Sequence, residues 1–258
     1  MKLEKNSTLL GIVTARGGSK GVPHKNLYPV AGKPLIAYCI RAAQSSGIFD
    51  RIIISTDSQR IADVARALNV DVPFMRPKEL AEDSTPHFPV VRHALDALPE
   101  KYPYAAIIAP TAPLVQGRHW MEAWDLLRSR EGSAVIGVCE VPFKYHPAKS
   151  MAEDPRGFLR IPEERRKGTP RQATPKGYYS TAGVYIFKTA NVAGGDFYGD
   201  KVIPYEMEEE YALDINERKD MAEARRRIAV PYDPRIQEQD ELAYQAICRS
   251  FTGEKSAS

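Results

Sequence analysis

A short apolar run, Leu9–Val13, leads directly into a loop that is rich in glycine and positive charge. The run is short and ends at a glycine-rich stretch, which favours a buried strand. The loop, residues 15–26, contains three glycines and three cations: Gly17, Gly18, Gly21, Arg16, Lys20 and Lys25. Because glycine has no side chain, the backbone N–H groups of such a loop can approach a ligand closely. Backbone donors and clustered positive charge at the end of a strand favour a polyphosphate site over an ordinary surface turn.

Two familiar phosphate-binding loops do not fit this stretch. The Walker loop requires Gly-x-x-x-x-Gly-Lys-Ser/Thr, and the dinucleotide fingerprint requires Gly-x-Gly-x-x-Gly. Gly32 and Lys33 are followed by Pro34, and Leu27 stands where the first Walker glycine belongs. The loop therefore represents another class of phosphate-binding structure.

Strands and helices are expected to alternate regularly up to residue 138. The apolar patterns predict strands at 9–13, 51–57, 105–109 and 134–138, and helices at about 34–46, 61–68, 88–98 and 120–127. This alternation predicts an α/β fold with a doubly wound, mostly parallel sheet and helices on both faces. Ligands of such sheets bind at the carboxyl ends of the strands. The first loop, Thr56–Asp57 and Pro110–Thr111 should therefore share one rim.

The regular pattern ends at about residue 140. Residues 140–176 are rich in proline and charge. A structureless loop of that length would be unusual in a compact domain, so we expect an arm that has its own structure or packs on a partner chain. A strand at 184–187 and a helix at 217–228 should follow. We expect one main domain over residues 1–228, including the arm, and a C-terminal extension over 229–258 with one helix around 237–251.

The composition narrows the class of protein. With 258 residues, 43% of them hydrophobic, the chain can bury a sizeable core. The formal charge of +3 is spread along the sequence, which argues against a nucleic-acid partner. Three widely spaced cysteines, Cys39, Cys139 and Cys248, indicate reduced thiols of a cytoplasmic protein. The apolar runs fall short of the roughly 18 residues of a membrane span, and the charged N-terminus lacks a signal-peptide pattern, so we expect no membrane partner.

Several ordered blocks resemble the acylneuraminate cytidylyltransferase family, whose members activate sialic acids and related acidic sugars. Besides the first loop, the blocks are Ile-Ser-Thr-Asp (54–57), Arg-Pro-Lys-Glu-Leu-Ala-Glu-Asp (76–83), Pro-Thr-Ala-Pro-Leu (110–114), Arg-Gln-x-x-Pro (171–175), Ala-Gly-Val-Tyr-Ile (182–186) and Leu-Asp-Ile-Asn (213–216). Each block alone is a weak signal, but their shared order over residues 8–227 makes the resemblance specific. It implies a Rossmann-like nucleotidyltransferase fold and an enzyme that joins CMP from CTP to an acidic sugar, releasing pyrophosphate.

The resemblance also implies which residues bind the nucleotide. CTP would be held by Arg16, Gly17, Gly18, Ser19, Lys20, Lys25, Asn26, Arg76 and Thr111. Arg16 and Lys25, together with Asp214, would be the catalytic groups. Arg76 would lie near the base or ribose, although Arg76-Pro77 could instead shape a turn. Thr111 stands in a stiff turn between two prolines, which suits a ribose or base contact and a structural role equally well.

Asp214 matches the first acid of the family's Asp-x-Asp metal pair. The resemblance implies Mg²⁺, because a nucleoside triphosphate carries close to four negative charges that repel an anionic nucleophile. Asn216 takes the place of the second acid. Its amide oxygen can still ligate Mg²⁺, directly or through water, but the site loses one formal charge. Asn216 also stands just before the expected helix at 217–228, where it would be a good N-cap.

A third group of residues would bind the acidic sugar. It consists of Lys149, Arg171, Gln172, Tyr185, Phe197 and Tyr198. Arg171 is suited to a bidentate grip on a carboxylate. Taken singly, each of these residues is more typical of a surface, sheet or core position than of a binding site, and only the order of the blocks favours a binding role for Arg171.

Three departures from the family pattern favour an acceptor other than sialic acid. Ala109 stands before Pro110 where sialic-acid enzymes usually carry Gln, and Val115 stands where they carry Arg. Ala182-Gly183 replaces their Asn-Gly. At these positions the chain resembles relatives that activate pseudaminic acid. Alternative acceptors are 3-deoxy-manno-octulosonate and a phosphonate.

The resemblance further implies a homodimer in which the arm reaches over the neighbouring subunit's site. A function of another class also stays open. Because of Asn216, the chain could be a nucleotide-binding relative with impaired catalysis, which would bind CTP without turnover.

Overall fold

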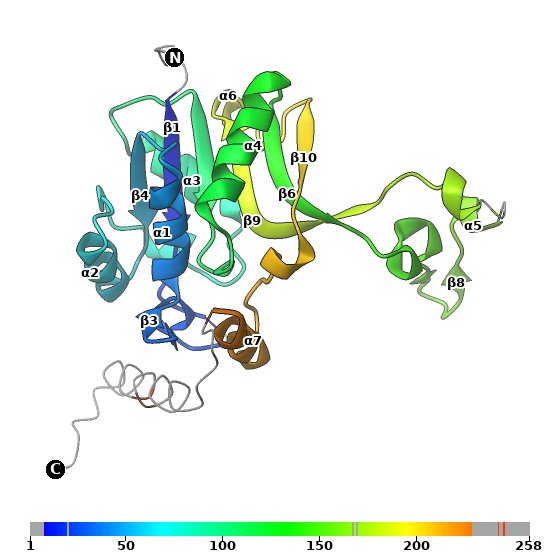
Figure 1. The fold of residues 1–258 in the computed structure, drawn as a ribbon, viewed down its shortest axis with the longest axis horizontal. Coiled ribbons are helices and arrows are strands. Elements are labelled where there is room, and N and C mark those ends of the chain that lie inside the picture. The colour runs from blue at the N-terminus through cyan, green and yellow to red at the C-terminus, as the bar shows by residue number, and fades with distance from the viewer. Residues whose placement is uncertain are drawn as a thin grey trace.

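The computed structural model of the protein describes residues 8–228, apart from residues 20, 167 and 169, together with Leu242 and Gln245. Figure 1 shows a body built around one central sheet and an arm that projects from it. In the described part of the chain, no helix is long and apolar enough to cross a membrane. Cys39 and Cys139 are buried free thiols. Cys248 and the helix expected around 237–251 lie outside the described residues, apart from residues 242 and 245.

The central sheet has six strands in the order β10-β6-β9-β5-β1-β4. Their bounds are β1 Leu9–Thr14, β4 Arg51–Ser55, β5 Tyr104–Ile108, β6 Ala134–Glu140, β9 Tyr178–Lys188 and β10 Val202–Glu206. β1 pairs in parallel with β4 and β5, and β10 pairs in parallel with β6. β9 is antiparallel to both β5 and β6. The predicted α/β fold with a mostly parallel sheet is confirmed, and β9 is the antiparallel strand within it.

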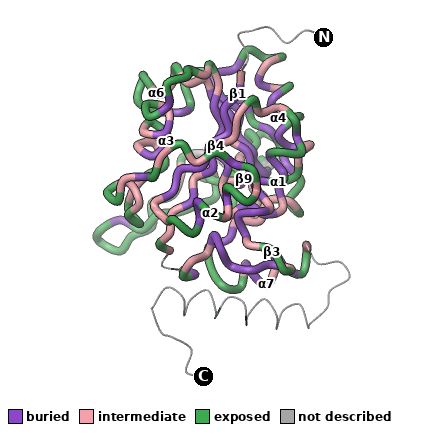
Figure 2. Tube along the Cα trace, turned by 90° about the vertical axis from the view of Figure 1, so that its left-hand side faces the viewer, coloured by how far each residue is buried: buried purple, intermediate pink, exposed green. Residues whose placement is uncertain are grey.

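Helices cover both faces of the sheet. The longer ones are α1 Ile36–Ser46, α2 Gln59–Ala67, α3 His87–Asp96, α4 Gly117–Ser129 and α7 Arg218–Ile228. Leu9 and Val13 of β1 point into a core shared with α1, α2 and α4, whereas Leu10 and Ile12 point the other way, toward α3. This alternation follows from the two-residue period of a strand. Figure 2 shows the buried residues concentrated in the central elements, with exposed residues around them.

Shorter elements connect these layers. They are the hairpin of β2 Pro29–Val30 and β3 Lys33–Pro34, α6 Ala190–Ala193, and the 3-10 turns η1 Lys25–Leu27, η2 Lys78–Leu80 and η6 Glu209–Tyr211. Pro34 pairs with Pro29 in the hairpin, so α1 begins at Ile36 rather than at Pro34. Ser58 caps α2 by accepting the Ile61 N–H at 3.5 Å.

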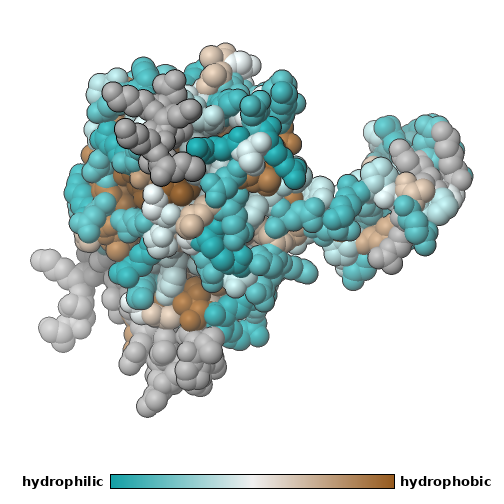
Figure 3. All heavy atoms as spheres, turned by 45° about the horizontal axis from the view of Figure 1, so that its top comes forward, coloured by the Kyte–Doolittle hydropathy of each residue, from teal (hydrophilic) through white to brown (hydrophobic). Residues whose placement is uncertain are grey.

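The arm comprises residues 141–177, between β6 and β9, close to the predicted 140–176. It contains η3 Phe143–Tyr145, η4 Pro147–Lys149, β7 Ala152–Glu153, β8 Leu159–Arg160, α5 Glu163–Arg166 and η5 Arg171–Ala173. Among arm residues whose burial is described, only His146 and Asp154 are buried, and both are polar. Phe158 and Leu159 are 66% and 58% exposed. The described arm therefore has local structure but no hydrophobic core, and Figure 3 shows a narrow hydrophilic neck joining it to the body.

Candidate functional site

A cleft of about 340 Å³ lies at the carboxyl ends of β1 and β5. Stretches of chain that are far apart in the sequence form its walls: the first loop, residues 76–90, residues 109–111 and residues 214–216. The predicted site residues that line it are Arg16, Gly18, Ser19, Lys25, Asn26, Arg76, Thr111, Asp214 and Asn216. Lys20 lies outside the described residues. The structure thus brings the proposed phosphate loop and the proposed metal ligands into one cavity.

The backbone of the first loop is fixed by neighbouring polar groups. Gly17 donates its N–H to Asp57 Oδ1 at 2.8 Å, which ties the loop to the end of β4. The side-chain amide of Asn26 donates to the carbonyl oxygen of Arg16 at 2.9 Å. On its other side, Gly21 is so close to Asn216 that an added Cβ would meet the Asn216 carbonyl oxygen at 2.5 Å. The loop is therefore held in a defined conformation from both sides.

The cations of the loop have partners across the cleft. Arg16 Nη2 lies 2.5 Å from Asp83 Oδ1, in an ion pair about one-third exposed on each side. Lys25 Nζ donates to the carbonyl oxygen of Ile215 at 2.7 Å. Burial lowers the pKa of Lys25, and the charge of Asp214 counteracts this while Arg16 reinforces it. A partly desolvated ammonium next to a guanidinium would gain from a polyanionic ligand.

Arg76 combines a structural position with a place in the cleft wall. Its side chain is 6% exposed and donates to the hydroxyl and the carbonyl oxygen of Ser55, at 3.0 and 2.5 Å. Burial lowers the pKa of Arg76 to about 10, so it stays charged at neutral pH. Arg76 therefore braces the chain before η2 against β4 and also presents positive charge to the cleft, which is compatible with both roles considered from the sequence.

Asp214 and Asn216 stand side by side at the cleft. The Asn216 amide donates to Asp214 Oδ2 at 3.0 Å. At the start of α7, the backbone N–H groups of Asn216 and Glu217 donate to Asp220 Oδ2, both at 2.8 Å. Asp220 thus supplies the acceptor for this helix start, and the Asn216 side chain faces the proposed metal ligand instead.

The cleft wall also contains Glu82, Asp83 and His87, to which the sequence assigned no role, and Ala182, which was noted only as a departure from the family pattern. Desolvation, reinforced by the charges of Arg76 and Arg16, lowers the pKa of His87 and keeps its imidazole neutral at neutral pH. Ala182 has a left-handed backbone with φ of 55°, at the irregularity in the pairing of β9 with β6. Its position in the block 182–186 was a signal for the site, whereas nothing in the sequence distinguished His87.

The predicted acceptor residues whose side chains the structure describes do not line this cleft. Lys149 and Gln172 lie on the arm, and the side chain of Arg171 lies outside the described part of the structure. Tyr185, Phe197 and Tyr198 form an aromatic cluster, with centroid distances of 6.3 Å from Tyr185 to Phe197 and 6.0 Å from Tyr185 to Tyr198. Phe197 is 7% exposed and packs on Phe187, as a core residue would.

One protein-family model matches most of the chain. The model described as Cytidylyltransferase matches residues 10–228, which include the whole cleft. The chain belongs to the cytidylyltransferase family. Cytidylyltransferases are nucleotidyltransferases, so the cation-lined cleft has the composition that such an enzyme needs for a triphosphate.

This cytidylyltransferase is similar to several named proteins. It is 31% identical to the pseudaminic acid cytidylyltransferase of Campylobacter jejuni over 184 residues, 70% of this chain and 78% of that protein. It is 33% identical to the CMP-N,N'-diacetyllegionaminic acid synthase of the same species over 215 residues, 82% of this chain and 91% of that one. The N-acylneuraminate cytidylyltransferase of Streptococcus agalactiae is 28% identical over 248 residues, 95% of this chain and 59% of that protein.

A solved structure supports the fold. The structure described as CMP:2-keto-3-deoxy-manno-octonic acid synthetase complexed with CTP superposes with a TM-score of 0.67, covering 88% of this chain and all of that one. The sequence identity is 14%, so the likeness concerns the fold alone. It confirms the Rossmann-like nucleotidyltransferase architecture that the sequence blocks implied.

The donor set of this cytidylyltransferase suits a metal shared with a nucleotide. Among the described residues, no group of three or more His, Cys, Asp and Glu side chains could hold a metal ion. Mg²⁺ in nucleotide sites commonly takes only one or two carboxylates, with phosphate oxygens and waters as its other ligands. Asp214, which faces the cleft beside Lys25 and Asn216, therefore fits a magnesium ion that arrives with a triphosphate.

Proposed function

We propose that this protein transfers CMP from CTP to an acidic nonulosonic sugar in a magnesium-dependent reaction that releases pyrophosphate. The observation that carries the proposal is the meeting of Arg16 and Lys25 with Asp214 in one cleft at the strand ends. Positive charge for the triphosphate and a carboxylate for its metal are both needed for phosphoryl chemistry. Buried free thiols at Cys39 and Cys139 suit the cytoplasm, where we place the reaction.

The side chains of the cleft act mainly by positioning and charge. The first loop and Lys25 would bind the phosphates, and Arg16 would exchange its contact with Asp83 for a phosphate oxygen. A hydroxyl oxygen of the sugar would attack the α-phosphorus and lose its proton. The bond from that phosphorus to the bridging oxygen would break, and pyrophosphate would leave in line with the attack.

Asp214 and Asn216 would hold the Mg²⁺. When bound, the ion would neutralise charge on the phosphates as the leaving group forms. Lys25 links this pair to the loop, because its ammonium group bonds the carbonyl oxygen of Ile215, between the two residues. Asn216 lowers the negative charge of the pair by one compared with two acids, so we expect a weaker metal site.

The acceptor is proposed from the relatives. Similar proteins are named for pseudaminic, legionaminic and N-acylneuraminic acids, all of them acidic sugars. Ala109 and Ala182 line the cleft where the sialic-acid pattern carries amides, which favours pseudaminic acid or a close analogue. Tyr185, Phe197 and Tyr198 lie outside the cleft, and Phe197 is buried, so we propose no contact between them and the sugar. A 3-deoxy-manno-octulosonate or phosphonate acceptor is the alternative within the same reaction.

We also propose that the protein works as a homodimer through its arm. The described arm has no hydrophobic core and exposes Phe158, Leu159 and Ile161. Exposed apolar side chains on a segment without a core favour burial against a partner chain. In such a dimer Lys149, Arg171 and Gln172 would reach the partner's cleft. The absence of Lys149 and Gln172 from the cleft of their own chain supports this arrangement.

The test is a screen of acceptor acids for CTP-dependent release of pyrophosphate. We expect release with a nonulosonic acid and Mg²⁺, and a large loss of rate in Asp214→Ala that extra Mg²⁺ restores only in part. Normal rates in Asp214→Ala would remove this residue from the metal site. CTP binding without turnover on any acid would favour the impaired relative, and Asn216→Asp should then raise metal affinity.

A further inference from the structure

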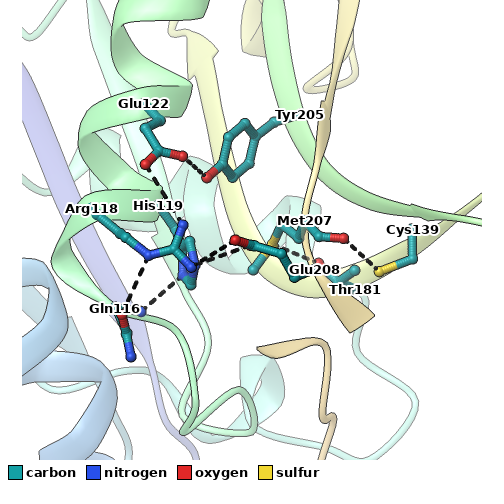
Figure 4. A network of polar contacts seen from close by, with 9 residues as sticks. All are labelled: Gln116, Arg118, His119, Glu122, Cys139, Thr181, Tyr205, Met207 and Glu208. Atoms are coloured by element: carbon teal, nitrogen blue, oxygen red, sulfur yellow. Dashed lines mark hydrogen bonds and ion pairs between the residues drawn. The ribbon is translucent and has the colours of Figure 1, made fainter. Parts of the chain in front are cut away.

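A polar network outside the cleft holds the chain that leads to Asp214. Residues 207–215, called here the connecting segment, run from the end of β10 through η6 to Ile215. Figure 4 shows the network between the start of α4 and this segment. Arg118 of α4 donates from Nη2 to Glu208 Oε1 at 2.9 Å. Its guanidinium also lies over the ring of Tyr211, 4.9 Å from the centroid, so one side chain contacts the segment at two places.

The two ends of the connecting segment are held by backbone bonds. Met207 donates its N–H to the carbonyl oxygen of Val138 at 2.8 Å, and Ile215 donates to that of Thr111 at 2.8 Å. Between these points, Arg227 donates to the carbonyl oxygen of Glu210 at 2.8 Å, and Arg118 supplies the side-chain contacts to Glu208 and Tyr211. A loosened middle would let the segment pivot on its ends, and Asp214 lies next to one of them.

His119 of α4 also belongs to this network. It is fully buried, and its Nδ1 accepts the backbone N–H of Gln116 at 3.0 Å, so the proton of the neutral ring lies on Nε2. Nε2 has no hydrogen-bond partner within the described structure and lies 3.7 Å from Glu208 Oε2. An unpaired buried N–H is costly and calls for an explanation. Here it is aimed at the carboxylate that Arg118 holds.

We propose that Arg118 is a positioning residue of this enzyme: through Glu208 and Tyr211 it fixes the connecting segment and thereby the place of Asp214. The inference rests on the proposed function, in which Asp214 binds the metal of CTP. Neither Arg118 nor Glu208 lines the cleft, so their effect would reach the metal only through the segment. Residues that orient metal ligands typically change metal affinity by about 10–100-fold when replaced. Because the Arg118–Glu208 pair is partly exposed, its contribution is weakened by solvent. We therefore expect a loss of metal affinity near the lower end of this range.

The experiment measures binding of Mn²⁺, as a probe for Mg²⁺, to the full-length protein with CTP and without acceptor, by titration calorimetry. We expect Arg118→Met and Glu208→Gln each to weaken Mn²⁺ binding by about five- to tenfold. The double variant should be no weaker than either single one, because the pair acts as a unit. With acceptor present, the Mg²⁺ concentration for half-maximal rate should rise by the same factor.

Glu122→Gln is the matched control. Glu122 contacts the same arginine, with Oε1 3.7 Å from Arg118 Nη1, and accepts from the Tyr205 hydroxyl at 2.5 Å, but it does not reach the connecting segment. Glu122→Gln removes one negative charge, as Glu208→Gln does. We therefore expect a change in thermal stability with unchanged Mn²⁺ affinity. Should Arg118→Met fail to fold, Arg118→Lys keeps the charge, loses the flat contact with Tyr211, and should show a smaller effect in the same direction.

Asp214→Asn, measured in parallel, tests the metal assignment separately from the positioning role of Arg118. If it abolishes Mn²⁺ binding while Arg118→Met and Glu208→Gln bind normally, the positioning role is wrong and the proposed function stands. If Asp214→Asn itself binds Mn²⁺ normally, the metal assignment fails, and the positioning role fails with it. Equal weakening in Glu122→Gln would also overturn the proposal, because the effect would then follow the loss of a charge rather than contact with the segment.

Discussion

Gly21→Ala should disable the site through a single methyl group. The added Cβ would lie 2.5 Å from the carbonyl oxygen of Asn216, and ordinary van der Waals contact begins at 3.4 Å. The loop or the 214–216 stretch must therefore move by about 0.9 Å, because a backbone oxygen cannot rotate out of the way. Displacements of about 1 Å in a catalytic arrangement cost about 100-fold in rate, equivalent to about 2.7 kcal/mol.

The assay is kcat/KM for CTP in continuous pyrophosphate release, with the melting temperature measured beside it. Gly132→Ala is the control, because its added Cβ would also meet an atom at 2.5 Å, the Cδ1 of Ile203. That atom ends a flexible side chain away from the cleft, so this variant should lose stability and keep its KM for CTP. A folded Gly21→Ala protein with the kcat/KM of the wild type would refute the reasoning, since the close approach of the loop to Asn216 would then have no role.

Three further predictions concern the arm, pH and backbone strain. Replacing Phe158 and Leu159 by Ser should shift the protein toward monomer in sedimentation, because these exposed side chains are proposed to be buried by the partner; an unchanged dimer would locate the interface elsewhere. Burial lowers the pKa of His119 from 6.5, so below that pH the unfolded state binds protons first and stability falls on acidification. His119→Gln should flatten this part of the melting-temperature profile, and an identical pH slope would contradict it. Ala182→Gly should raise the melting temperature by about 2–4 °C, because glycine relieves about 1 kcal/mol of left-handed strain at φ of 55°; a lower value would show that the bulge is not strained.

Local sequence patterns located the strands that carry clear apolar runs. They missed β10 and most of β9, for different physical reasons. β10 contains Pro204, which usually argues against a strand and is tolerated here because β10 is the edge of the sheet. In β9 the polar Ser180 and Thr181 interrupt the apolar pattern, and the Thr181 hydroxyl donates to the carbonyl oxygen of Gly137 at 3.0 Å inside the sheet. In both segments the strand forms because it pairs with neighbouring strands of the sheet, which the local sequence pattern does not show.

Some of the site residues could be predicted from physical rules, and the others only from the resemblance to the family. Arg16 and Thr111 both follow predicted strands, and the carboxyl ends of parallel strands share one edge of the sheet, so their proximity could be predicted. The meeting of Asp214 with the first loop depends on long-range packing, so it could be expected only from the family blocks. The ion pair of Arg16 with Asp83 could not be predicted, because local sequence does not show how residues 76–83 fold back on the first loop.

The bond from Lys25 to Ile215 joins residues 190 positions apart, and this separation has a consequence for biosynthesis. At about 5–20 residues per second, a ribosome needs roughly 10–40 s to make the intervening chain. Throughout that time the nascent protein carries the first loop without Asp214, which completes the site. A truncated product that stops before Asp214 would keep the attraction for polyanions and lack the carboxylate needed to use them. We therefore expect that nucleotide binding can stabilise only a chain that has been synthesised beyond Ile215, because the site is incomplete before that point.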